Sequence, residues 1–145
     1  MKIGFTGTRR GMTLDQQQAF ITLIQTLAPT ELHHGSCQGA DAKAARLARA
    51  NLMKVTIHAH PGPDGDEWRE TSGVDDFRHI PNTHFARNRE IVAFTDALIA
   101  TPAEKDHQMR GGTWYTIDHA LVKGKTVWII EPDGTIKEVG NGNSL

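Results

Sequence analysis

Four short segments of the chain concentrate small and cationic residues, a combination typical of sites that bind an anion. They are 7–10 (GTRR), 35–41 (GSCQGAD), 87–89 (RNR) and 110–113 (RGGT). Glycine lets a phosphate approach the main chain, and an arginine fork can bind two phosphate oxygens at once. In any one segment the glycines could simply mark a turn and the arginines a solvated surface. The four segments together favour an anion site.

Several polar residues in or near these segments could contact the ligand. Thr113 and Thr116 offer hydroxyl donors, and Asp41 offers a carboxylate that could accept hydrogen bonds from ribose hydroxyls. The same carboxylate could instead serve only the dipole of the helix in which it lies. Cys37 lies in the second segment, but no histidine partner can be named for it. A nucleophilic role for Cys37 is therefore the weaker hypothesis.

Three aromatic residues are candidates for stacking on a base. Trp68 lies in a long polar stretch, and Trp114 and Tyr115 follow the RGGT segment. Each of them could equally be a packing residue.

The eight histidines raise the question of a metal. His58 and His60 would point to the same face of a strand, and His33 and His34 end another strand. A zinc site needs three or four converging ligands, and the sequence contains neither a cysteine pair nor an HExxH motif. We therefore predict no metal and no cofactor. His60 begins the long polar stretch, and we expect it to line the ligand site.

Strands and helices alternate along the chain. Expected strands cover residues 2–6, 31–34, 54–58, 96–100 and 126–130, and expected helices begin near residues 13, 40, 85 and 112. The first helix opens with TLDQ, which has the spacing of a capping box. Several strands are continuous apolar runs, which is typical of a parallel sheet covered on both faces. The predicted fold class is a three-layer α/β, Rossmann-like domain with a mostly parallel sheet of about five strands.

Two stretches have no clear place in this alternation. Residues 60–82 are long for a loop in a compact domain, so we expect a functional flap or a short helix there. Residues 133–145 have the composition of a turn and a fraying end.

Ligands of such sheets bind outside the carboxyl ends of the strands, near the point where the strand order reverses. The loops that follow the strands would therefore meet at one edge and form one site. The residues that we predict to bind the ligand there are Gly7, Thr8, Arg9, Gly35, Ser36, Gly39, Ala40, His60, Arg89, Arg110, Gly111, Gly112, Thr113 and Thr116.

Length and composition limit the number of domains, the partners and the cellular location that we expect for this protein. A length of 145 residues is that of one ordinary domain, residues 1–145, and the net charge of −1 provides no general field for a nucleic acid or an anionic membrane. The single cysteine cannot form an internal disulfide, and no apolar run is long enough for a signal peptide or a membrane helix. We expect a cytoplasmic protein with no membrane partner.

The order of the motifs resembles that of a known superfamily. GFTGTRRG, HHGSCQGADAKAARLA, RNREIV, DALIATP, RGGTWYTIDHA and KTVWIIEPDG occur in that order over about residues 2–134. This series is similar to the SLOG superfamily of Rossmann-like nucleotide-binding proteins, which includes the LOG phosphoribohydrolases and DNA-processing protein A. It most resembles the small bacterial and phage members of unassigned role. The resemblance implies a nucleotide-derived ligand with its phosphate on residues 111–113 and the first loop, and a homodimer or higher homo-oligomer.

The resemblance also implies candidates for catalysis. LOG enzymes cleave the N-glycosidic bond of a nucleoside monophosphate with an arginine, which aligns here with Arg87, and a glutamate in PGGxGTxxE. This chain instead has RGGTWYTIDHA, in which Asp118 is the only nearby carboxylate and lies one residue out of register. The candidate catalytic residues are therefore Arg87, Asp41 and Asp118.

Two functions of different classes remain open, and a third ranks last. The chain could be a hydrolase, a nucleoside 5′-monophosphate N-glycosidase in which a carboxylate stabilises an oxocarbenium ion. It could instead be a nucleotide sensor or sequestering protein without catalysis, which the missing glutamate favours. A protein that handles single-stranded DNA, as the DNA-processing branch does, ranks last because the charge is balanced.

Overall fold

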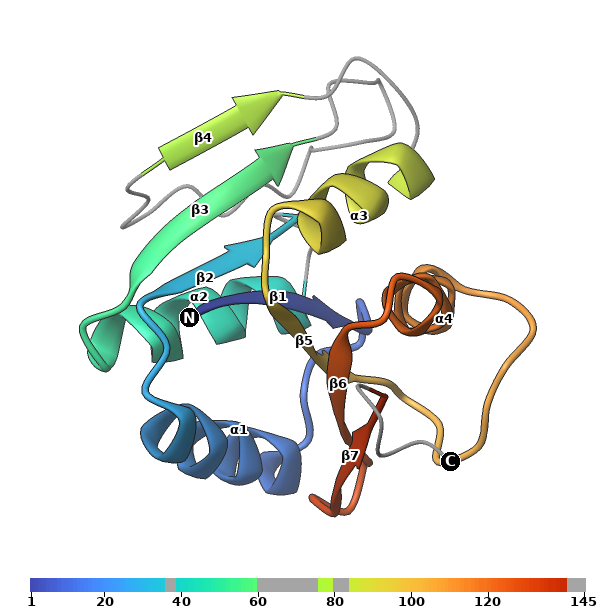
Figure 1. The fold of residues 1–145 in the computed structure, drawn as a ribbon. Coiled ribbons are helices and arrows are strands. Elements are labelled where there is room, and N and C mark those ends of the chain that lie inside the picture. The colour runs from blue at the N-terminus through green and yellow to red at the C-terminus, as the bar shows by residue number, and fades with distance from the viewer. Residues whose placement is uncertain (36–38, 60–75, 80–83, 141–145) are drawn as a thin grey trace.

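The computed structural model describes residues 1–35, 39–59, 76–79 and 84–140 (Figure 1). Its elements, in chain order, are β1 (Lys2–Gly7), α1 (Leu14–Leu27), β2 (Glu31–His34), α2 (Ala40–Ala50), β3 (Lys54–Ala59), β4 (Asp76–His79), α3 (His84–Ala93), β5 (Ala97–Thr101), α4 (Gly112–Val122), β6 (Thr126–Ile130) and β7 (Ile136–Val139). Among the helices in these ranges, none is long and apolar enough to cross a membrane.

Within the described ranges, seven strands form one sheet in the order β4-β3-β2-β1-β5-β6-β7. The strands β1 to β6 are mutually parallel, and β7 pairs with β6 in the antiparallel direction. The predicted Rossmann-like α/β class with a mostly parallel sheet is confirmed.

The expected number of about five strands was too low. The strand β4 lies in the stretch 60–82, where we expected a flap or a short helix, and β7 lies in the tail that we expected to fray. Both strands have only four residues and are rich in charged side chains, DFRH and IKEV. They form at the two edges of the sheet, where a strand needs no continuous apolar run because only one neighbour pairs with it.

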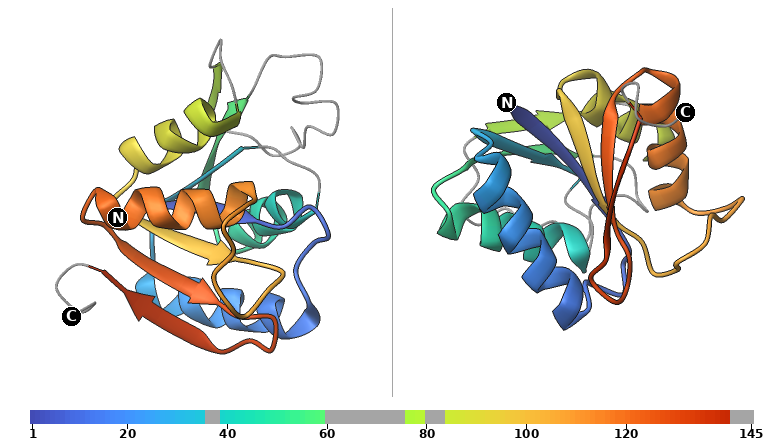
Figure 2. Two further views of the ribbon diagram at one scale, coloured as in Figure 1. Left: turned by 90° about the vertical axis from the view of Figure 1, so that its right-hand side faces the viewer. Right: turned by 60° about the horizontal axis from the view of Figure 1, so that its bottom comes forward.

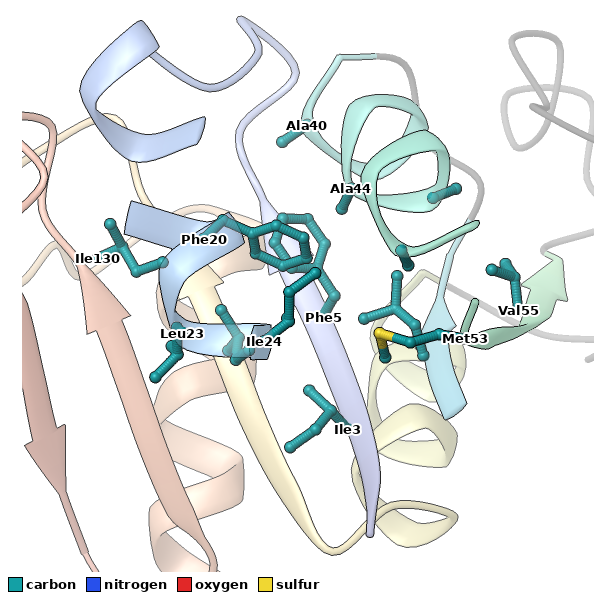
Figure 3. Close-up of a cluster of buried hydrophobic side chains, with 14 of the residues drawn as sticks. Ile3, Phe5, Phe20, Leu23, Ile24, Ala40, Ala44, Met53, Val55 and Ile130 are labelled. Carbon is teal, nitrogen blue, oxygen red and sulfur yellow. The ribbon is translucent and has the colours of Figure 1, made fainter. Parts of the chain in front are cut away.

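Helices cover both faces of the sheet (Figures 1 and 2). The helices α1 and α2 lie on one face, and α3 and α4 lie on the other. The helix α2 can lie close to the sheet because its buried face consists mainly of alanines, including Ala40, Ala44 and Ala48. Figure 3 shows Ala40 and Ala44 beside Phe5 of β1 and Phe20 of α1, whose rings pack edge to face at 5.5 Å between centroids. The three layers that the sequence predicts are therefore present.

The order of the strands reverses at β1. The chain runs from β1 outward to β2 and β3 on one side, and it later returns to place β5 and β6 on the other side. The ends of these elements meet closely, since a Cβ atom added to Gly7 would lie 2.5 Å from both Ala40 Cβ and Thr101 Oγ1. The carboxyl ends of β1 and β5 thus form the switch point at which open α/β sheets bind their ligands.

Candidate functional site

A cavity of about 520 Å³ opens at this switch point. Its volume is within the range of small-molecule sites, about 300–1,000 Å³. Ten of the predicted site residues line it: Gly7, Thr8, Arg9, Gly35, Asp41, Arg87, Arg110, Gly111, Gly112 and Thr113. The structure therefore brings together residues from all four of the segments that the sequence singled out.

The start of α4 forms one wall of the cavity. Gly111 precedes the helix with a φ of +101°, and no side chain caps the helix start. The first backbone N–H groups of an α-helix have no acceptor within the helix. Gly112, Thr113 and Trp114 are the first residues of α4, and all three line the cavity. Their N–H groups and the positive end of the helix dipole favour an anion there.

At two other helix starts, N–H groups have partners within the protein. At α1, Thr13 Oγ1 accepts a hydrogen bond from Gln16 N, and Gln16 Oε1 accepts one from Thr13 N, both at 3.0 Å. This arrangement is the predicted capping box. At α2, the Ala40 N–H donates to the carbonyl of Thr8 at 3.1 Å. No side chain caps α2 or α4, but α4 is the one of these three helices whose first three residues all line the cavity.

Arg87 lines the cavity and is only 3% exposed. Its guanidinium donates to the carbonyl of Gly35 at 2.6 Å and to Asn88 Oδ1 at 2.7 Å. A Cβ atom on Gly35 would lie 2.5–2.7 Å from the guanidinium, so only glycine leaves room for this side chain. The glycine that follows β2 therefore positions an arginine of α3.

Two carboxylates line the same cavity. Asp41, in the first turn of α2, is 4% exposed. Glu104 follows β5, and its Oε1 accepts a hydrogen bond from Trp114 Nε1 at 3.0 Å. Four arginines line the cavity beside them, Arg9, Arg10, Arg87 and Arg110, so positive charge exceeds negative charge among the described lining residues. The excess of positive charge suits an anion, and the two carboxylates can accept hydrogen bonds from hydroxyl groups of the same ligand.

Sequence reasoning missed Glu104, Phe85 and Asn88 as lining residues. Glu104 lies in a loop that follows a strand, which was a usable signal. Its hydrogen bond to Trp114 depends on the fold of that loop, which no local pattern predicts. Asn88 lies within the 87–89 segment that the sequence singled out, but only the two arginines of that segment were named as candidates.

Several predicted residues do not line the cavity. Gly39 and Ala40 lie beside it at the start of α2, and a Cβ atom on Gly39 would lie 2.3 Å from the carbonyl oxygen of Arg9. The Thr116 hydroxyl donates to the Gly112 carbonyl at 2.6 Å, within α4.

Arg89 and Asp118 also lie outside the cavity. Arg89 Nη1 donates to Tyr115 Oη at 2.8 Å, and Asp118 pairs with His107 at 2.9 Å on the exposed side of α4. Both side chains point to other partners because each lies on an outward helix position. The candidate residues Ser36, Cys37, His60 and Trp68 lie outside the described residues.

The histidines of β2 and β3 form a separate buried cluster. His33 Nδ1 lies 2.8 Å from His58 Nε2, and His58 Nδ1 lies 2.7 Å from Glu90 Oε1. Burial lowers the pKa of His33, and it lowers the pKa of His34 to about 3. The described residues contain no group of three side chains that could hold a metal ion.

The fold and the place of the cavity define a Rossmann-like α/β protein with a cavity at its switch point. No protein-family model matches the chain, and no curated protein matches it. The fold is nevertheless similar to solved structures.

One similar structure is the molybdenum cofactor binding protein of the phototrophic bacterium Rippkaea orientalis, with a TM-score of 0.68 and 20% identity over 90% of this chain and 76% of the other. Another is TM1055, a structural genomics target, with a TM-score of 0.63 and 16% identity over 87% and 71%. A third is DNA processing protein A from Helicobacter pylori, described for its binding of single-stranded DNA, with a TM-score of 0.61 and 22% identity over 89% and 64%. All three structures are less than 25% identical to this chain, and the similarity therefore shows a shared fold.

Proposed function

We propose that the protein binds a nucleotide or a nucleotide-derived ligand in the cavity at the switch point. The open start of α4 carries this proposal, because it offers backbone donors and a helix dipole beside the exposed Arg110. A phosphate group matches both features. Arg9 and Arg10 of the first loop add positive charge to the same cavity.

The other charged side chains of the cavity suit the ribose of the proposed nucleotide ligand and the part of the ligand beside it. Asp41 could accept hydrogen bonds from ribose hydroxyls, as the sequence suggested, and Glu104 adds a second acceptor. Arg87 would lie next to the sugar or the base, since it occupies the end of the cavity that Gly35 of the β2 loop and α3 form.

Calorimetric titration with a nucleoside 5′-monophosphate and with the matching nucleoside tests this proposal. We expect the monophosphate to bind at least about tenfold more tightly, because the nucleoside lacks the group that the α4 start binds. Arg110→Ala should weaken binding of the monophosphate. Lys105→Ala should leave this binding unchanged, because Lys105 is an exposed cation of the same loop that does not line the cavity. The proposal is wrong if no nucleotide in a panel of bases and phosphate numbers binds or raises the melting temperature.

A second candidate is hydrolysis of the N-glycosidic bond, and the pair of carboxylates in one cavity favours it. The bond between C1′ and the base nitrogen would break, water would supply hydroxyl to C1′, and its proton would leave with the base. Asp41 or Glu104 would stabilise the positive charge on the sugar as this bond breaks.

Chromatography of nucleotides incubated with the protein tests hydrolysis directly. We expect equal amounts of free base and ribose 5-phosphate. If Glu104 acts on the sugar, Glu104→Gln should slow the release about 100-fold while keeping an acceptor for Trp114, because it removes the charge. Asp106→Asn, in the same exposed loop but not in the cavity lining, is the matched control. Binding without any release would instead identify a sensor or sequestering protein.

A further inference from the structure

The cavity has an aromatic wall that the proposed function does not use. Phe85, near the start of α3, lines the cavity and is 48% exposed. Its ring contacts that of Tyr115 on α4, with 4.5 Å between the centroids and 52° between the planes. Phe85 therefore offers an apolar surface at the edge of a cavity that is otherwise rich in charge.

Tyr115 holds this wall in place. Its hydroxyl accepts a hydrogen bond from Arg89 at 2.8 Å, and its ring stacks on His119 with 6° between the planes. A ring whose neighbour is fixed in this way loses less conformational freedom when a ligand covers it. The contacts of Arg89 thus serve the wall of the site, although Arg89 itself does not line the cavity.

Trp114 does not offer such a surface. It is 6% exposed and packs among the buried residues between α4 and the sheet, and its indole N–H donates to Glu104. The hypothesis that Trp114 stacks on a base is therefore not supported by its placement, and Phe85 is the half-exposed aromatic residue among the described lining residues.

The aromatic wall lies next to the proposed phosphate position but is distinct from it. A Cβ atom on Gly112 would lie 3.5 Å from Asn88 Nδ2, so α4 begins beside Asn88 of α3. Phe85 precedes Asn88 by one helical turn, about 5 Å along α3. The ribose of a nucleotide likewise separates its base from its phosphate, as this turn of α3 separates Phe85 from the α4 start.

We propose that Phe85, supported by Tyr115, is the surface on which the flat ring of the ligand stacks, a nucleobase or a related heterocycle. This inference rests on the proposed function, since it assigns the base end of the same ligand. Every base has a π-face, so stacking on Phe85 contributes affinity without selecting one base by hydrogen bonds.

Two probes that differ only in the base test the inference, adenosine 5′-monophosphate and ribose 5-phosphate. We expect Phe85→Leu to weaken binding of the nucleotide about tenfold or more and to leave binding of ribose 5-phosphate unchanged. Phe85→Trp should retain nucleotide binding, because it keeps an aromatic face. Phe94→Leu is the matched control, since Phe94 directly follows the same helix, is 43% exposed and does not line the cavity.

The outcomes separate this inference from the function on which it rests. If Phe85→Leu weakens both probes equally, or weakens neither, the stacking role is wrong while nucleotide binding stands. If the unaltered protein binds neither probe nor any other nucleotide, the proposed function is wrong and the inference fails with it. A melting temperature of Phe85→Leu close to that of the unaltered protein shows that a change in binding is not a loss of folding.

Discussion

Arg87 illustrates how one buried charge can depend on one missing side chain. The guanidinium is buried, bonds to the carbonyl of Gly35 and occupies the space that a Cβ atom there would need. A buried charge is costly unless it is hydrogen-bonded. The guanidinium therefore cannot move to another buried position without losing the partners that stabilise it. The two residues are 52 positions apart in the sequence and act as one unit.

We predict that Gly35→Ala weakens nucleotide binding about tenfold, because the added methyl group displaces Arg87. Calorimetry of Gly35→Ala, Arg87→Ala and the double variant measures this coupling. If the glycine acts through the arginine, the double variant should bind no more weakly than Arg87→Ala alone. Losses that add in the double variant would contradict this explanation.

At the scale of elements, the helices differ in how their first N–H groups are satisfied. Thr13 caps the start of α1, the Ala40 N–H of α2 donates to the first loop, and the first turn of α4 has no side-chain cap and lines the cavity. Gln16 connects α1 to the site, since its Nε2 donates to Pro102 O at 2.8 Å and to Ile130 O at 3.0 Å. It thereby fixes the point at which the loop carrying Glu104 and Arg110 leaves β5.

We predict that Gln16→Leu lowers the free energy of unfolding by about 2–3 kcal/mol, because it removes the partner of two carbonyl groups at a buried position. Urea unfolding measures this change. Gln18→Leu, an exposed position on the same helix, is the control and should change stability by less than about 0.5 kcal/mol. Equal stabilities for the two variants would mean that the Gln16 hydrogen bonds contribute nothing.

At the scale of the whole molecule, the sheet carries buried histidines that do not line the cavity. His34 is completely buried, and burial lowers its pKa to about 3, with nearby His58 and Arg87 acting in the same direction. Burial also lowers the pKa of His33, although Glu31 opposes this shift. Both side chains are therefore neutral in the folded protein at neutral pH.

We predict that stability falls as the pH drops below about 6.5, the ordinary pKa of a histidine. The unfolded chain then takes up a proton at His34 that the folded protein cannot accept until about pH 3. Between pH 7.5 and 5, this one group should lower the free energy of unfolding by about 2 kcal/mol. Above pH 7.5, it should have no effect.

Urea unfolding of the unaltered protein and of His34→Gln at pH 7.5 and pH 5 measures the contribution of this group. The variant should lose less stability between the two pH values, whatever its stability at pH 7.5. An equal loss in both proteins would show that His34 does not carry the dependence.

The alternation of apolar strands and helices determined the α/β class and the position of most elements, because their core residues are local and periodic. The sequence also determined which loops carry glycine and arginine. The short edge strands β4 and β7 escaped prediction, since their pairing depends on a neighbouring strand and not on their own composition.

Only the tertiary structure decided which loop residues share the cavity. Asp118, Arg89 and Thr116 were candidates by sequence position, yet their side chains meet other partners, whereas Glu104 and Phe85 line the cavity. The physical reason is that side-chain direction and loop path depend on contacts between distant segments, such as Trp114 with Glu104 and Arg87 with Gly35. The sequence thus determined that several cationic, glycine-containing loops exist, and the strand order decided that they meet at one edge.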